Sequence, residues 1–224
     1  MDIIRYRKAT MDDAAFLAMV VAEALGNNLM ERMAMGEDTL QDRELIQQLA
    51  SVCQRTDTLY SWKHALMAIS PDNQPIGAIV AYPGECYMES RHLTFSLLSN
   101  LNTFDVNVMD AETRDGEYYL DSLAVDPRGR GNGIARRLLM PAQQEAKQMG
   151  RPAILACAPD NCGAKRLYEA LGFHEEGHLF IFGEDYLRMV SSSVTSSEST
   201  YSPWRQSLCS YTMRRMALVN SVTP

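Results

Sequence analysis

The sequence predicts an α/β protein in which one sheet is flanked by helices. Apolar runs with the period of a strand alternate with longer stretches that carry helix-capping residues and a helical apolar stripe. The apolar strand 118–125 leads into a glycine-rich stretch, 128–135, and then into a helix that ends near Met149. With 224 residues, 46% of them hydrophobic, the chain is long enough to bury a full core.

The first residues predict an edge strand followed by a helix. Residues 3–9 alternate in the manner of an exposed strand. Thr10 and Asp13 have the spacing of a capping box ahead of an apolar helical stripe, and Gly26 is placed to end that helix.

A second helix and a hairpin are predicted next. Thr39 and Asp42 repeat the capping-box spacing at the start of a helix over 39–54. Two apolar runs on either side of the turn "PDNQ" indicate a β-hairpin over 64–83.

The C-terminal part predicts one more helix between strands. Residues 153–158 have the pattern of a short buried strand, and 160–172 that of a helix capped by Asp160 or Asn161. The stretch 180–190 supplies two final strands.

The chain therefore divides into one domain and a tail. Residues 1–190 are expected to fold together. Residues 191–224 begin with a serine-rich linker and are expected to form a flexible C-terminal tail.

The composition excludes several functional classes. The formal net charge of -7 repels polyanions, so we expect neither nucleic acid nor a membrane as a partner, and the same field mildly favours cationic ligands. No apolar run reaches the ~20 residues that cross a bilayer, and the N-terminus carries charges where a signal peptide needs an apolar segment. Five cysteines without a C-x-x-C pair indicate reduced thiols in a cytoplasm, with neither a disulfide framework nor a metal site.

The glycine-rich stretch suggests a phosphate cradle. A Walker loop is excluded because no lysine follows the glycines, and the dinucleotide fingerprint fails because Ile134 stands where its third glycine belongs. The pattern [QR]-x-x-G-x-[GA] does fit, in two frames that begin at Arg128 or at Arg130. A diphosphate can approach backbone without side chains, and the N–H groups and dipole of the helix's first turn attract it. A tight turn with solvated arginines is the alternative.

The motifs around this stretch resemble those of the GNAT superfamily of N-acetyltransferases. "RGNGIARRLL", 130–139, matches the family's R-G-x-G-[IL]-[GA]-x-x-L-[LM], with Val125 and Pro127 at the usual distances ahead of it. "NCGAKRLYEALGF", 161–173, matches N-x-x-A-x-x-L-Y-x-x-x-G-F. The resemblance covers about residues 3–190 and favours the second frame. It implies a mixed, mostly antiparallel sheet that is splayed at the acetyl-CoA site.

The resemblance also implies an enzyme that moves the acetyl group of acetyl-CoA directly to a primary amine, on a small molecule or on a peptide or protein. An alkylammonium with a pKa near ~10.4 must first lose a proton, and the departing thiolate must be stabilised. Tyr168 matches the tyrosine that the family places near the sulfur. Because a phenol is a weaker acid than a thiol, we expect Tyr168 to donate a hydrogen bond to the thiolate, with proton transfer late or incomplete.

Asp121 and Glu117 are the candidates for the base. The period of two places Glu117, Tyr119, Asp121, Leu123 and Val125 on one face of the central strand. Asp121 falls where some family members carry a histidine for this purpose. With an ordinary pKa of ~3.9, an aspartate needs burial or a water relay to act as a base, and it can instead hold the substrate cation or bond to nearby backbone. The sequence does not separate the two residues.

The resemblance assigns acetyl-CoA binding mainly to backbone groups. The main chain of Leu123 and Val125 would hold the pantetheine arm, which Asn161 contacts from the other side. Arg130 or Arg128 would neutralise phosphate. The amides expected to bind the diphosphate belong to Gly131, Asn132, Gly133, Ile134 and Ala135.

One further expectation concerns the acceptor. The segment 84–115, with a short helix within 91–101, is interpreted as an insertion that shapes the acceptor site.

The alternative to an enzyme is a non-catalytic acyl-CoA-binding sensor or partner module, which keeps the glycine loop but performs no transfer. Tyr168 argues against that module, and a homodimer is compatible with the sequence.

Overall fold

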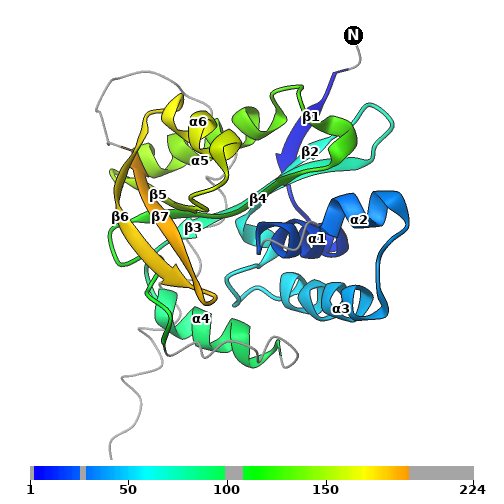
Figure 1. Cartoon of the computed structure of the whole chain (residues 1–224), viewed down its shortest axis with the longest axis horizontal. Helices are drawn as coiled ribbons and strands as arrows, with labels where there is room; N and C mark the ends of the chain where they lie inside the picture. The colour runs from blue at the N-terminus through cyan, green and yellow to red at the C-terminus, as the bar shows by residue number, and fades with distance from the viewer. Residues whose placement is uncertain (1–2, 26–28, 99–107, 192–224) are drawn as a thin grey trace, which may run out of the picture.

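Figure 1 shows the computed structural model of the chain, which describes residues 3–25, 29–98 and 108–191. One seven-stranded sheet runs through these residues, with the strand order β1-β2-β3-β4-β5-β7-β6. Neighbouring strands are antiparallel except for β4 and β5, which are parallel. The predicted mixed, mostly antiparallel sheet is confirmed. The helix end expected at Gly26 lies outside the described residues, as do residues 192–224 of the tail expected at 191–224. Ser191 is the last residue of β7.

The N-terminal half of the chain forms three strands and three helices. They are β1 (Arg5–Lys8), α1 (Ala14–Ala24), α2 (Leu29–Met35), α3 (Leu40–Gln54), β2 (Ala65–Ile69) and β3 (Pro75–Pro83), with the short 3-10 helices η1 (Met11–Asp13) and η2 (Trp62–His64). Both capping boxes form as predicted: the Thr10 and Thr39 amides donate to the Oδ2 atoms of Asp13 and Asp42, at 2.7 and 2.8 Å. Helix α2 was not anticipated from the sequence.

The chain after β3 forms the rest of the sheet. Its elements are α4 (Tyr87–Ser96), β4 (Tyr118–Val125), η5 (Pro127–Gly129), α5 (Ile134–Gln148), β5 (Ala153–Cys157), α6 (Cys162–Glu169), β6 (Phe173–Ile181) and β7 (Glu184–Ser191). The first of the two final strands begins earlier than predicted, because pairing with β7 extends back to Phe173 opposite Ser191. No helix in the described part of the chain is long and apolar enough to span a membrane.

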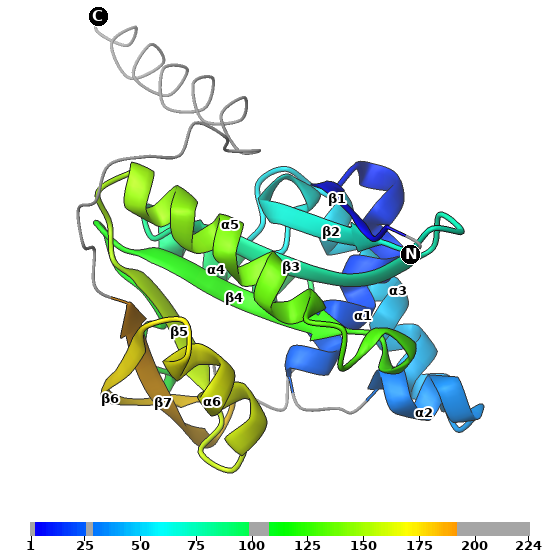
Figure 2. The ribbon, with the colours of Figure 1, turned by 90° about the horizontal axis from the view of Figure 1, so that it is seen from above.

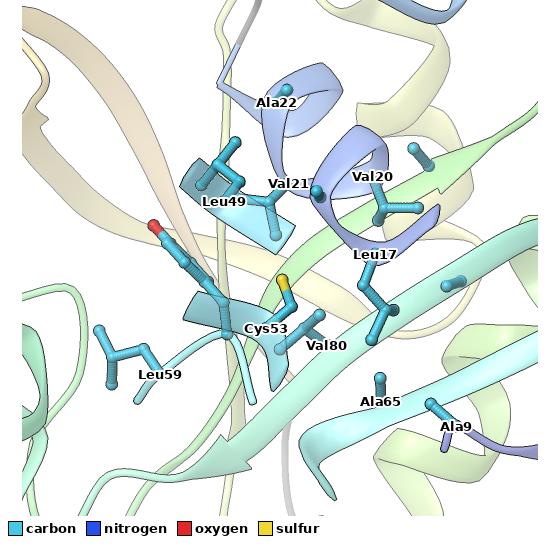
Figure 3. Close-up of a cluster of buried hydrophobic side chains, with 14 of the residues drawn as sticks. Ala9, Leu17, Val20, Val21, Ala22, Leu49, Cys53, Leu59, Ala65 and Val80 are labelled. Carbon is cyan, nitrogen blue, oxygen red and sulfur yellow. The ribbon is translucent and has the colours of Figure 1, made fainter. Parts of the chain in front are cut away.

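Helices cover both faces of the sheet (Figure 2). Helices α1 and α3 pack on one face through a cluster that includes Leu17, Val21 and Cys53 together with Val80 of β3 (Figure 3). Helix α5 packs on the other face through a second cluster that includes Leu138. Each large apolar side chain buried in these clusters contributes roughly 1.5–3 kcal/mol, so β4 is held firmly between two layers of helices.

The second half of the sheet parts from β4. β4 and β5 pair only at Tyr118 with Ala153 and at Tyr119 with Ile154, although both strands continue beyond these residues. Figure 2 shows β5, β6 and β7 turning away from β4. The expected splay is therefore confirmed, and the backbone edge of β4 beyond Tyr119 faces a gap.

Candidate active site

A β-bulge interrupts the central strand at Asp121. Val80 of β3 lies opposite Ser122, and the next residue, Ala81, lies opposite Leu120. Asp121 is thus the extra residue on the β4 side of the ladder. Such a bulge locally disturbs the pairing and re-aims a side chain.

The bulge changes which face of the sheet the side chains meet. Ahead of it, Tyr119 packs with α1 and α3, whereas beyond it Leu123 and Val125 pack in the cluster of α5 on the opposite face. The expectation that Glu117, Tyr119, Asp121, Leu123 and Val125 share one face is therefore wrong. One extra residue shifts the period of two by a single position, and that shift reverses the face for every residue beyond it.

A pocket opens where β4 and β5 separate, and its lining brings four of the predicted site residues together. They are Asp121, Leu123, Asn161 and Tyr168. The other lining residues, which sequence reasoning missed, are Ala24, Leu120, Leu139, Leu155, Ala156, Cys157, Ala158 and Tyr186. No sequence pattern connects these residues. They come together because they lie beside the gap between β4 and β5, so the strand pairing was needed to find them.

The Asp121 carboxylate is held by two hydroxyl groups inside the protein. Tyr82 of β3 donates to its Oδ2, and Ser122 donates to its Oδ1 at 2.7 Å. Burial and, after it, the nearby charge of Glu112 raise the pKa of Asp121 to about 7. Asp121 thus gains the basicity that an exposed aspartate lacks, because both causes disfavour its charged form.

Tyr168 lies across the pocket on α6. Its ring packs edge-on against Phe173, with 6.0 Å between the ring centroids. Burial raises the pKa of Tyr168 above its usual value, and the nearby Cys157 adds to the rise. The phenol therefore stays protonated at neutral pH and is suited to donate a hydrogen bond.

Glu117 directly precedes β4 and lies in a cluster of ion pairs, away from the residues that line the pocket. Its Oε1 accepts from Arg114 Nε and from Arg188 Nη2, both at 2.7 Å. Its Oε2 accepts from the Thr113 hydroxyl and from the Arg114 amide, both at 3.2 Å. The side chain is 5% exposed, so these partners compensate the cost of burying its charge. The arrangement ties the chain ahead of β4 to β7.

The glycine-rich stretch forms a turn between β4 and α5. Asp126 caps η5, and the backbone then passes through left-handed conformations at Gly131 (φ 79°) and Gly133 (φ 70°), which residues with a side chain adopt only with strain. The Arg137 amide donates to the Gly133 carbonyl at 3.1 Å, which is a bond across the first turn of α5. The amides of this turn that come before Arg137, from Ile134 on, therefore precede the intrahelical bonds of the helix. These amides can donate hydrogen bonds to a bound anion.

Both candidate phosphate-binding arginines have carboxylate partners in this structure. Arg128 pairs with Asp126, at 2.8 Å from Nη2 to Oδ2. Arg130 Nη2 lies 3.1 Å from Glu23 of α1, its Nη1 pairs with Glu31 of α2, and its Nε donates to the Val125 carbonyl at 3.1 Å. The guanidinium of Arg130 therefore links the loop to the two helices beside it.

Asn161 has a structural task as well as a place in the pocket. Its Oδ1 accepts from the Ala164 amide at 3.0 Å, which caps α6 as the sequence predicted. Val125 and the residues of the loop lie beyond the lined pocket, further along the open edge of β4.

The segment 84–115 packs against the β6–β7 hairpin where the structure describes it. Phe95 of α4 contacts Phe182 in the hairpin turn, with 5.8 Å between the ring centroids. Asp110 accepts from the Phe180 amide at 2.7 Å, and its own amide donates to the Phe180 carbonyl at 2.9 Å. The expected short helix is present as α4 and begins earlier than predicted, because Tyr87 and Arg91 are buried on its first turns. Residues 99–107 of this segment lie outside the described ranges.

Within the described ranges, no three side chains of His, Cys, Asp or Glu gather in a way that would hold a metal ion.

A family model described as "Acetyltransferase (GNAT) family" matches residues 37–173. This range includes the strand, the glycine turn and the helix with Tyr168 that frame the pocket. No curated protein matches the chain by sequence.

Solved structures share the fold. An N-acetyltransferase from Staphylococcus aureus Mu50 superimposes with a TM-score of 0.68 at 22% identity, over 83% of this chain and 99% of that one. A second acetyltransferase structure is 27% identical, with a TM-score of 0.64, over 85% of this chain and 100% of that one. A structure described as a histone acetyltransferase HPA2 and related acetyltransferase from Corynebacterium glutamicum has a TM-score of 0.59 at 16% identity, over 88% and 100% of the two chains.

Proposed function

The chain belongs to the GNAT acetyltransferase family, which uses acetyl-CoA, and from that premise we propose that it moves an acetyl group directly from acetyl-CoA to a primary amine. The amine belongs either to a small molecule or to a peptide or protein. The observation that carries this proposal is that Asp121 and Tyr168 line one pocket, at the place where β4 and β5 separate.

The proton balance of the reaction suits these two residues. An alkylammonium with a pKa of ~10.4 has to lose a proton before its nitrogen can attack the thioester. Asp121, with its pKa raised to about 7, takes up that proton more readily than an ordinary carboxylate does. Tyr168 stays protonated and donates a hydrogen bond to the thiolate as the carbon–sulfur bond breaks. Glu117, bound by Arg114 and Arg188, is assigned a structural role instead.

The donor is proposed to lie along the open edge of β4. The main chain of Leu123 and Val125 would hold the pantetheine arm, with Asn161 on its other side, because β4 has no strand partner next to them across the gap. The diphosphate would meet the amides of the turn from Gly131 to Ala135. Arg128 and Arg130 would reach phosphate only by exchanging their carboxylate partners for it.

The acceptor is proposed to enter on the side of the segment 84–115. This segment packs on the β6–β7 hairpin, and Tyr186 of that hairpin lines the pocket together with Asp121. The segment would thereby shape the space that the amine occupies.

A survey of amines tests the proposal. Purified protein is given acetyl-CoA and, in turn, small amines, polyamines, amino acids and peptide N-termini, and the release of free CoA thiol is measured. Turnover with at least one class is expected, and Asp121→Asn should abolish most of it. Binding of acetyl-CoA in calorimetry without CoA release from any acceptor would instead favour a non-catalytic acyl-CoA-binding module. Absence of binding would contradict the donor site itself.

A further inference from the structure

A second buried carboxylate lies beside Asp121 and has no part in the mechanism described so far. Tyr82 and Tyr119 are opposite each other in the β3–β4 ladder, and their rings meet edge-on at 5.9 Å between centroids. The Tyr82 hydroxyl donates to Asp121, and the Tyr119 hydroxyl donates to Glu112 Oε2 at 2.6 Å. The two packed phenols thus connect the carboxylate in the bulge, Asp121, to a second one from the segment ahead of β4, Glu112.

Glu112 is placed firmly and away from water. It comes from the segment that leads into β4 and is 7% exposed. Its second oxygen, Oε1, accepts from the Tyr87 hydroxyl of α4 at 2.8 Å. One phenol donor on each oxygen is the pattern that suits an ionised carboxylate, because a protonated acid would have to donate from one of them. Burying such a charge is costly, so its place beside a candidate base calls for a role.

We propose that Glu112 is a positioning residue for the acetyl transfer proposed above: its carboxylate, fixed by Tyr87 and Tyr119, acts on Asp121 so that Asp121 accepts the proton of the substrate amine. Asp121 takes one proton from the ammonium nitrogen, whose lone pair then attacks the thioester carbonyl carbon. The carbon–sulfur bond breaks, and a second proton from the nitrogen ends on the thiolate. The proton on Asp121 passes to water after the product leaves.

Among the residues that the structure describes, the other ionisable groups that act on the pair are neutral or positively charged at neutral pH. They are Cys53 of α3, Tyr60, His64 of η2, Tyr87 and Arg91 of α4, and Tyr186 and Arg188 of β7. Burial raises the pKa of Cys53 to about 12 and keeps the pKa of each tyrosine above its usual value, whereas it lowers the pKa of His64. Burial raises the pKa of Glu112, whereas the hydrogen bonds from Tyr119 and Tyr87 and, after them, the positive charge of Arg91 oppose this rise and favour its ionised form. In its ionised form, Glu112 is the negative neighbour that, after burial, raises the pKa of Asp121.

The pH dependence of kcat/KM tests the proposal with the amine that the survey finds most active. The acid limb of the wild-type profile reports the protonation of Asp121. In Glu112→Gln, which keeps the shape and removes the charge, this limb should move to lower pH by about one unit or more. The kcat should fall severalfold, because Asp121 becomes a weaker base, while the KM for acetyl-CoA stays unchanged. Glu112→Asp, which keeps the charge, should restore the position of the limb.

Two further variants separate a role in the reaction from a role in folding. Glu145→Gln removes another buried carboxylate, on α5 at the opposite face of the sheet, and should leave the limb in place. If Glu112→Gln does not fold, Tyr87→Phe withdraws one donor from Glu112 and should move the limb in the same direction by a smaller amount. A limb that stays in place in Glu112→Gln, or in Tyr87→Phe if Glu112→Gln does not fold, would overturn the proposal.

A titration of Asp121 without substrate tests the effect of Glu112 on Asp121 independently of turnover. The carboxyl carbon of Asp121 is followed by 13C NMR in aspartate-labelled protein and assigned from the signal lost in Asp121→Asn. Its midpoint should lie at lower pH in Glu112→Gln than in the wild type, and an unchanged midpoint would refute the role of Glu112. If the wild type turns over no amine, the proposed function fails while this titration still tests the effect of Glu112 on Asp121.

Discussion

The two halves of the proposed site, one for the donor and one for the acceptor, are built in different ways. The proposed donor half is a contiguous run of backbone, in which the left-handed turn at Gly131 and Gly133 leads into the first amides of α5. The proposed acceptor half consists of side chains from separate segments, namely Tyr82 of β3, Glu112 ahead of β4, and Asp121 in the bulge. The difference implies that the donor half depends on conformation, whereas the acceptor half depends on individual functional groups.

The largest expected effect is on the acceptor half. Asp121→Asn removes the base but keeps the shape, so kcat/KM for the amine should fall by ~10²–10⁴-fold. The affinity for acetyl-CoA, measured by calorimetry, should stay within about twofold of the wild type, because backbone groups carry donor binding. If Asp121→Asn retains full turnover, the acceptor half does not depend on this carboxylate.

Tyr168 lies between the two halves, and its loss should have the next largest effect. Tyr168→Phe removes the hydrogen bond to the departing thiolate, and kcat should fall by roughly 10–10²-fold with little change in the KM of either substrate. Tyr6→Phe on β1, at the far edge of the sheet, is the matched control and should leave kcat unchanged. Equal rates for Tyr168→Phe and the control would remove Tyr168 from the mechanism.

The donor half should respond to a change of backbone conformation. Gly133→Ala puts a side chain at a φ of 70°, where the added Cβ meets nothing within 4 Å, so the strain is in the backbone and costs roughly 1–2 kcal/mol. The affinity for acetyl-CoA should fall by up to about tenfold, because the amides no longer hold their places. Gly150→Ala has nearly the same geometry (φ 69°) beyond the end of α5. It should lower stability alike but leave acetyl-CoA binding intact, and equal affinities for the two variants would contradict the cradle.

The last expected effect is on stability and not on the reaction. Asp121 has its pKa raised to about 7 in the folded protein, against ~3.9 when unfolded. Between these values the folded state keeps a proton that the unfolded state releases, so the free energy of unfolding falls as the pH rises from about 4 to about 7 and levels off above. Relative to Asp121→Asn, the wild type should gain on the order of 1–3 kcal/mol between pH ~7 and pH ~5 in urea denaturation. A constant difference would mean that Asp121 titrates at an ordinary pKa.

The contrast between the halves also explains what could be predicted from the sequence. Motifs within short runs predicted the family, the glycine turn and the Asn161 cap of α6, because local backbone geometry and helix capping depend on neighbouring residues. The same motifs singled out Tyr168, which the structure places in the lining of the pocket. The bulge at Asp121 depends on the register of two strands, so the period of two put Tyr119 and Leu123 on the same face wrongly. Glu112 and Tyr82 were missed because only the folded sheet brings them beside Asp121.

A crystal structure with a non-hydrolysable acetyl-CoA analogue tests the central claim most directly, since the claim is that one pocket brings Asp121 and Tyr168 to the same thioester. We predict that the atom replacing the sulfur lies within about 3.5 Å of the Tyr168 hydroxyl and that Asp121 faces the carbonyl carbon from the acceptor side. The diphosphate should lie on the amides from Gly131 to Ala135. An analogue bound away from the gap between β4 and β5, or one whose acyl group lies out of reach of both side chains, would contradict the account.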